Sequence, residues 1–366
     1  MLKFLILLSF GNQQFCKYNH YNAERMKLVK KILLHIFCCI MLAGLSENAA
    51  AARGKWYANN KSIHAMARID HISRDLNFLT DSLCDGRATG TPGIAAAAFW
   101  ITEKFESSGL LPFGGSYARS FFAGGDKRCG RNIIGMLPAK QGKSSASYII
   151  VGAHYDHIGR INGVLYPGAD SNASGTVALT TIAEMLDFSK KIGRVYDCNI
   201  ILVAFDSKEL SLTGSKHFMT LLDAGSLIDP LSGERVTKDK IRCMVNIDQI
   251  GGSQPLSKNG RKDFLMMLGK ESLNEYDRHV LSMCNKYYGT GLALSYTYFG
   301  SENFSKLFYT ELGDHSAFVK AGIPSVFFTT GITMNNNKPW DNAESIDLDI
   351  LRRRIILIWQ WISMMA

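Results

Sequence analysis

The residues with the clearest chemistry are histidines and carboxylates at the ends of apolar runs or at the starts of amphipathic segments. Imidazole and carboxylate groups are the ligands that zinc accepts where suitably spaced cysteines are lacking. A single such residue is more often a surface group or a helix cap, but here five segments each supply one or two. The candidates for a metal site that these segments supply include His154, Asp156, Asp170, Glu209, Asp248 and His315.

The segments that must position these side chains alternate between short apolar runs and amphipathic stretches. Such alternation predicts an α/β fold, a three-layer α/β/α sandwich with a mixed, mostly parallel central sheet. Ligands bind at the carboxyl ends of the strands in such sheets, and the candidate residues fall there. The expected strands are 132–137, 148–153, 199–205, 243–247, 264–268 and 325–329, and the expected helices are 63–83, 94–108, 174–190, 212–222, 274–288 and 315–320.

The order and spacing of these motifs resemble a known family from about residue 70 to the C-terminus. The motifs include His154-Tyr155-Asp156, the turn-rich loop at 86–93 and Ala321-Gly322-Ile323-Pro324. They are similar to those of the co-catalytic, two-zinc exopeptidases of the bacterial leucyl aminopeptidase and aminopeptidase Y family. That family also includes relatives of glutaminyl cyclase.

The resemblance implies a site with two zinc ions, which Co²⁺ or Mn²⁺ could replace. It implies that Asp170 bridges the ions, that His154 and Asp248 complete one of them, and that Glu209 and His315 complete the other. Asp156 would hold the far nitrogen of the His154 imidazole and fix its tautomer. Two ions about 3.5–4 Å apart can hold a bridging hydroxide and polarise the scissile carbonyl.

Lys208 departs from the family pattern. The family has a Glu-Glu pair here, in which the first Glu is the general base, whereas this chain has Lys208-Glu209. A lysine has an ordinary pKa of about 10.4 and normally lacks a lone pair to accept a proton. General-base catalysis typically contributes ~10²–10⁴-fold to a rate, so we expect a loss of that size. Asn337 is a second departure, since many relatives have a His near this position.

Three functions are compatible with this pattern. The first is a secreted zinc aminopeptidase, slowed by Lys208, that acts on peptides with a free N-terminus through a metal-bridging hydroxide. The second is an inactive peptidase homologue that binds peptides or a partner protein. The third is an acyltransferase like glutaminyl cyclase, for which one metal ion is expected in place of two.

The first 52 residues predict a leader rather than a part of the core. A basic segment at Met26–Lys31, an apolar run at 32–45 and small residues at Ala49–Ala52 form the pattern of a secretory signal, with Met26 as the expected true start. The apolar run is short for a membrane span. We therefore expect export to the periplasm or the extracellular space, no stable membrane span after cleavage, and a single catalytic domain over 53–366.

Charge and cysteine content bear on two further properties, nucleic-acid binding and disulfide bonding. The formal net charge is +9, of which +4 lies in residues 1–52. The sequence lacks a basic run interleaved with aromatic residues, which is the pattern that would predict nucleic-acid binding. Five of the eight cysteines follow the leader, without a CxxC pair. Export permits a disulfide among them, but its pairing and the oligomeric state cannot be read from the sequence.

Overall fold

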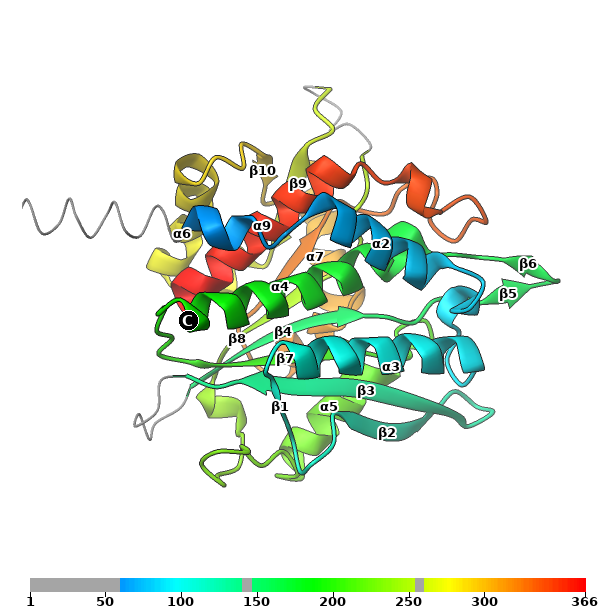
Figure 1. Ribbon diagram of the computed structural model, residues 1–366, viewed down its shortest axis with the longest axis horizontal. Helices are drawn as coiled ribbons and strands as arrows, with labels where there is room; N and C mark the ends of the chain where they lie inside the picture. Colours follow the sequence, from blue (N-terminus) through cyan, green and yellow to red (C-terminus); the bar gives the residue numbers. More distant parts are fainter. Residues whose placement is uncertain (1–59, 140–146, 254–259) are drawn as a thin grey trace, which may run out of the picture. The chain divides into compact units, whose positions relative to one another are not determined.

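The computed structural model describes residues 60–139, 147–253 and 260–366. The chain divides into two compact units, Met1–Lys61 and Ser62–Ala366, and the second of them contains all the candidate site residues. The leader predicted over residues 1–52 lies outside the described residues. The description below concerns the second unit (Figure 1).

A single mixed sheet forms the centre of this unit. In the described residues its order is β1-β3-β7-β4-β8-β11-β9-β10, with β2 paired to β3. The four neighbours β7, β4, β8 and β11 are parallel to one another, whereas β3 and β9 run antiparallel to them. The strands are β1 Leu111–Pro112, β2 Ala118–Ala123, β3 Arg128–Leu137, β4 Tyr148–His154, β7 Asn199–Phe205, β8 Ile241–Ile247, β9 Phe264–Leu268, β10 Ala293–Ser295 and β11 Ser325–Thr329, and β5 Arg160–Ile161 pairs with β6 Val164–Leu165 in a separate hairpin.

Alternate residues of the central strands enter two different cores. In β4, Ile149 and Val151 belong to the larger apolar cluster, while Ile150 belongs to the smaller one. Successive side chains of a strand point to opposite faces, so a strand covered on both faces is apolar along its whole length. This explains why every residue of β4 and β7 is buried.

Helices cover both faces of the sheet and form the two outer layers. The larger cluster includes residues of α2, α3, α4, α6 and α9, and the smaller one includes residues of α5 and α8. Figure 1 shows α2, α3, α4 and α9 on the same side of the sheet. The helices are α2 Ile69–Thr80, α3 Pro92–Ser107, α4 Ser174–Lys191, α5 Thr213–Asp223, α6 Glu275–Tyr287, α7 Glu302–Glu311, α8 His315–Lys320 and α9 Leu348–Met365.

The three-layer α/β/α fold with a mostly parallel centre is confirmed. The helix expected over 63–83 is shorter, since α2 covers Ile69–Thr80. The sequence analysis did not identify β2, α7 or α9. No helix of the described residues is both long and apolar enough to cross a bilayer. The five cysteines of that part of the chain, Cys84, Cys129, Cys198, Cys243 and Cys284, all carry free thiols.

Candidate ligand pocket at the carboxyl ends of the parallel strands

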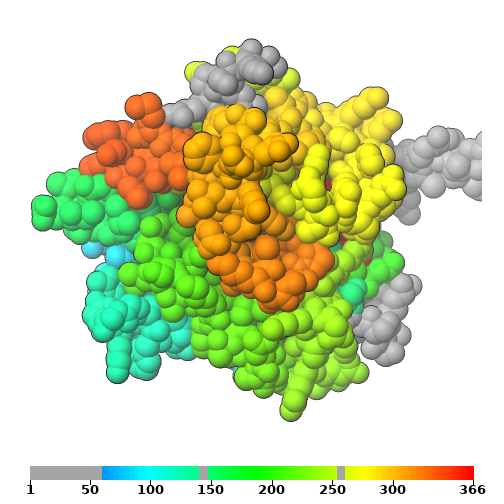
Figure 2. All heavy atoms as spheres, turned by 180° about the vertical axis from the view of Figure 1, so that it is seen from behind, coloured from blue at the N-terminus to red at the C-terminus, as the bar shows by residue number. Residues whose placement is uncertain are grey.

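A pocket with a volume of about 720 Å³ lies beyond the carboxyl ends of β7, β8 and β11. Helices α5, α7 and α8 supply part of its wall. Figure 2 shows this side of the molecule, where the orange segment that carries α7 and α8 lies beside the green segment that carries α5. The polar part of the lining includes Lys208, Glu209, Asp248, Gln249, Asn336 and Asn337.

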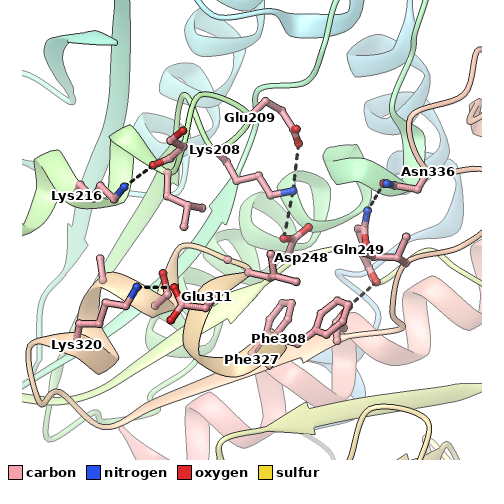
Figure 3. Close-up of a pocket in the computed structure, with 18 of the residues that line it drawn as sticks. Lys208, Glu209, Lys216, Asp248, Gln249, Phe308, Glu311, Lys320, Phe327 and Asn336 are labelled. Carbon is pink, nitrogen blue, oxygen red and sulfur yellow. Dashed lines mark hydrogen bonds and ion pairs between the residues drawn. The ribbon is translucent and has the colours of Figure 1, made fainter. Parts of the chain in front are cut away.

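Lys208 lies between two carboxylates on the floor of the pocket (Figure 3). Its Nζ is 3.1 Å from Oε1 of Glu209 and 3.9 Å from Oδ2 of Asp248. The Lys208 and Glu209 side chains are 21% and 23% exposed, whereas that of Asp248 is 6% exposed. The ammonium group therefore neutralises carboxylates that are mostly out of contact with water.

His154 and Asp156 support this floor from the end of β4. Nε2 of His154 lies 3.1 Å from Oδ1 of Asp248, and its Nδ1 lies 3.4 Å from Oδ1 of Asp156. The Asp156 carboxylate also accepts the backbone N–H groups of Lys208 and Glu209, each at 3.0 Å. Asp156 thus contacts the His154 imidazole, as the resemblance implies, and in addition fixes the backbone that carries Lys208 and Glu209.

The charges of this cluster depend on one another. Burial lowers the pKa of Lys208, but Asp248 and Glu209 together raise it above its ordinary value. Burial also lowers the pKa of His154, while Asp248 and Asp156 raise it, and the result is a pKa of about 10. Burial raises the pKa of Asp248, but Lys208 and His154 lower it below its ordinary range. At neutral pH the cluster holds two cations against carboxylates.

Asp170 lies outside this pocket, on the border of a second cavity of about 270 Å³. Its Oδ1 accepts the backbone N–H of Gly251 at 2.8 Å, and its buried Oδ2 has no hydrogen-bond partner among the described residues. Burial and the neighbouring Asp341 raise the pKa of Asp170 to about 7. These contacts give no support to the bridging role predicted for Asp170.

His315 also lies outside the pocket lining. Its ring stacks on Phe327 at a centroid distance of 4.6 Å, and its Nδ1 is 3.3 Å from Nδ2 of Asn246. Burial lowers the pKa of His315 to about 4, although Asp248 acts in the opposite direction. The imidazole is therefore neutral and packed behind the pocket.

As arranged here, the residues do not fit the two-zinc centre that the sequence predicts. Within residues 60–139, 147–253 and 260–366, no group of three or more His, Cys, Asp or Glu side chains is placed to hold a metal ion. The Lys208 ammonium lies between Glu209 and Asp248, where an ion would need those oxygens. The structure brings His154, Glu209 and Asp248 together. Asp170 and His315 lie outside the pocket lining, although each interacts electrostatically with Asp248, and the five ligand roles stay predictions.

The sequence analysis did not identify most of the remaining lining. Oδ1 of Asn336 accepts a hydrogen bond of 2.6 Å from Nε2 of Gln249, which closes one side of the floor. No periodic pattern in the sequence marks Gln249 or Asn336 as part of a site. Only the neighbouring Asn337 was identified, as a departure from the family pattern. The apolar part of the lining includes Leu212, Met219, Phe308, Leu312, Phe327 and Ile332.

Tyr298 holds two parts of this apolar wall in place. Its ring stacks on Phe308 with centroids 3.8 Å apart, and its hydroxyl oxygen accepts the backbone N–H of Ile332 at 3.0 Å. Phe308 belongs to α7, whereas Ile332 belongs to the loop after β11. One aromatic side chain therefore connects a helix and a loop on the pocket wall.

Comparison with known sequences confirms the predicted resemblance to a peptidase family. A family model for peptidase family M28 matches residues 132–362, which is more than half of the chain. The uncharacterized protein YfbL of Escherichia coli (strain K12) is 26% identical over 224 residues, which cover 55% of this chain and 59% of that protein. Aminopeptidase YwaD of Bacillus subtilis (strain 168) is 31% identical over 123 residues, which cover 34% of this chain and 22% of that protein. The matched part of this chain spans less than two thirds of the length of these curated relatives.

Solved structures share the fold. BSAP, a zinc aminopeptidase from Bacillus subtilis, superimposes with a TM-score of 0.57 at 15% identity and covers 81% of this chain and 94% of that one. The glutaminyl cyclase of Macrostomum lignano gives a TM-score of 0.63 at 15% identity and covers 84% of this chain and 92% of that one. At such low identity the likeness concerns the fold alone, and it includes both hydrolytic and cyclising proteins.

Proposed function

The chain belongs to peptidase family M28, and from that premise we propose that it binds the amino-terminal end of peptides without hydrolysing them. The observation that carries this proposal is the ion pair between Lys208 and Glu209 on the pocket floor. Lys208 stands where the family resemblance places the general base. Its charged ammonium has no lone pair to accept a proton from water at neutral pH.

The pocket suits the end of a peptide in size and polarity. Ligand pockets commonly measure about 300–1,000 Å³ and combine apolar walls with a few polar groups, and this pocket of about 720 Å³ does the same. Oε1 of Glu209 is bonded to Lys208, but Oε2 has no partner among the described residues. A peptide ammonium can pair with Oε2, and the first side chain can pack against Phe308 and Leu312.

The charges near the floor favour an amine over a carboxylate. The carboxylates of Glu209, Asp248 and Asp156 outnumber the cations of Lys208 and His154, so the local balance is negative. Two further lysines on the wall are engaged elsewhere. Nζ of Lys216 donates to the backbone oxygen of Ser211 at 2.8 Å, and Lys320 pairs with Glu311 at 2.8 Å.

Peptide binding is expected to depend on a free amino terminus and on Glu209. With the full-length chain, isothermal titration should detect trileucine but not N-acetyl-trileucine. Glu209→Gln should weaken trileucine binding at least about tenfold, because a hydrogen bond to a charged group typically contributes a net ~1.5–3 kcal/mol. Glu311→Gln is the matched control, since Glu311 lines the same pocket but is exposed and paired with Lys320. Equal binding of both peptides would contradict the proposal.

Hydrolysis is expected to be absent from the wild-type protein. Protein incubated with Zn²⁺ should leave a panel of aminoacyl-nitroanilides and dipeptides intact, and it should not cyclise a peptide that begins with glutamine. The same samples should bind trileucine, which separates an inactive pocket from an unfolded one. Zinc-dependent turnover of any dipeptide would overturn the non-hydrolytic part of the proposal.

A slow zinc aminopeptidase is the second candidate. The observation that favours it is that His154, Glu209 and Asp248 meet at one edge of the sheet, with Asp156 beside Nδ1 of His154. Under this candidate Lys208 limits the rate, so Lys208→Glu should raise zinc-dependent hydrolysis by at least about 10²-fold. The panel described above, applied to both proteins, distinguishes the two candidates.

We also propose that the protein is exported to the periplasm or the extracellular space. The support is the order of the basic segment, the apolar run and the small residues in the sequence before Arg53. Amino-terminal sequencing of protein from fractionated cells of the source organism should place the mature start close to Ala49–Ala52. Recovery of the unprocessed chain from the cytoplasm would contradict export.

A further inference from the structure

The buried carboxylates at the sheet edge need a nearby cation. A carboxylate that is taken out of water is costly unless a positive charge or several hydrogen bonds compensate it. Asp248 is only 6% exposed and follows β8 directly. Glu209 lies next to it across the pocket floor, where both contact the same ammonium group.

His154 compensates only one oxygen of these carboxylates, and Asp156 is itself a carboxylate. Oδ1 of Asp248 is satisfied by His154, while both oxygens of Asp156 accept backbone N–H groups. Oδ2 of Asp248 and Oε1 of Glu209 are left, and both face Lys208. No other lysine or arginine in the described part of the chain forms an ion pair with either carboxylate.

The backbone holds Lys208 so that its ammonium reaches this position. Its N–H is bound by Asp156, as is that of Glu209, and the preceding Ser207 has a left-handed backbone with φ 63°. The turn thereby aims the Lys208 side chain at the gap between two strand ends (Figure 3). The cation is tethered by the chain itself and cannot dissociate.

We propose that the Lys208 ammonium is a resident cation that takes the electrostatic place of a metal ion in this pocket. The pocket then keeps its shape without any divalent ion, and the carboxylates are unavailable to one while Lys208 is present. This inference concerns the charge balance of the free protein and does not depend on the peptide ligand. Removing the ammonium should leave Glu209 and Asp248 with unbalanced charge that a divalent ion can compensate.

Thermal unfolding of the full-length chain tests this inference. After chelation, wild-type protein should show the same Tm with and without added Zn²⁺ or Mn²⁺. Lys208→Met, which keeps the length but removes the charge, should lower the Tm in chelator, and Zn²⁺ should restore at least part of the loss. We expect titration to give zinc an affinity at least about tenfold higher for Lys208→Met than for wild type, since a unit charge within about 4 Å strongly repels a second cation. Lys320→Met is the matched control, because it removes a cation from the same pocket without exposing a buried carboxylate.

Three results would overturn the inference. One is a zinc-dependent rise in the Tm of the wild type that equals that of Lys208→Met. Another is a Lys208→Met protein as stable in chelator as Lys320→Met, and the last is a loss of stability that no divalent ion restores. If Lys208→Met does not fold in chelator, Lys208→Met combined with Asp248→Asn removes one charge of each sign, and it should regain stability without responding to zinc. Failure of the double variant to regain stability would also count against the inference.

Discussion

An Arg87→Met variant is expected to lose about 4 kcal/mol of its free energy of unfolding, one of the largest losses from a single substitution in this protein. Arg87 is fully buried, and its guanidinium donates to backbone oxygens only. Burial lowers the pKa of Arg87 to about 10, so the group stays charged at neutral pH. Its acceptors are the carbonyl oxygens of Tyr155 and Pro167, at 2.8 Å each, of Gly168, at 2.8 Å, and of Leu79.

The size of this loss follows from the acceptors rather than from the arginine. Methionine fills a similar volume but removes one donor from each of four carbonyl oxygens. The oxygen of Gly168 keeps the N–H of Ala173, and each buried acceptor left without a partner costs about 1–3 kcal/mol. These oxygens belong to the end of α2, the segment after β4 and the loop before Asp170. The guanidinium therefore connects three segments that border the site.

Urea denaturation measures this effect, with Arg160→Met as the control. Arg160 is exposed and pairs with Asp85 at 2.5 Å, so its loss should cost at most about 1 kcal/mol. Arg87→Lys keeps the charge but supplies one donor group for widely separated acceptors, and we expect an intermediate loss. It also provides a measurable variant if Arg87→Met does not fold. An Arg87→Met protein as stable as Arg160→Met would contradict the role given to Arg87.

The sequence predicts the sheet well because the central strands are buried on both faces. Runs such as 199–205, 264–268 and 325–329 are mostly apolar, and they coincide with β7, β9 and β11, in which every residue is buried. A helix buried on most sides gives no such clear signal. In α9, Ile355–Ile358 are four apolar residues in succession, so the 3.6-residue period that marks an amphipathic helix is hidden.

The candidate site could be predicted only in part. Residues that end a strand, such as His154 and Asp248, reach the predicted edge because the sheet fixes their direction. Asp170 lies in a loop whose next residues, Ser171 and Asn172, have non-helical backbone angles, and spacing does not reveal where its side chain points. The sequence identified Lys208 as a departure, but the ion pairs it forms depend on the distance between two separate strands.

These differences share a physical cause. In a helix or a strand, the regular backbone fixes where successive side chains point. The conformation of a loop and the geometry of an ion pair depend instead on contacts between segments that are distant in the sequence. The pocket floor contains both kinds of residue. Asp156 is the link between them, because it follows β4 and binds the backbone of the segment that follows β7.

Asp156→Asn is expected to weaken trileucine binding at least about tenfold and to lower the free energy of unfolding by about 2–3 kcal/mol. The Asp156 carboxylate accepts one N–H group on each oxygen, from Lys208 and from Glu209. An asparagine offers one oxygen, and its amide group would face the second N–H as donor against donor. Lys208 and Glu209 should then lose their fixed direction toward the pocket, and His154 should lose a neighbouring negative charge.

Asp229→Asn is the control that separates positioning from stability. Asp229 is also buried, and its Oδ1 accepts the backbone N–H groups of Leu231 and Ser232 at 2.8 and 3.0 Å, but it does not line the pocket. Its substitution should cost a similar free energy of unfolding and leave the trileucine Kd unchanged. Titration and urea denaturation of both variants give the comparison. Equal weakening of binding in both variants would show that Asp156 acts through general stability. Weakening in Asp156→Asn alone would identify Asp156 as the residue that positions the pocket floor, because its carboxylate, unlike that of Asp229, holds the backbone of Lys208 and Glu209.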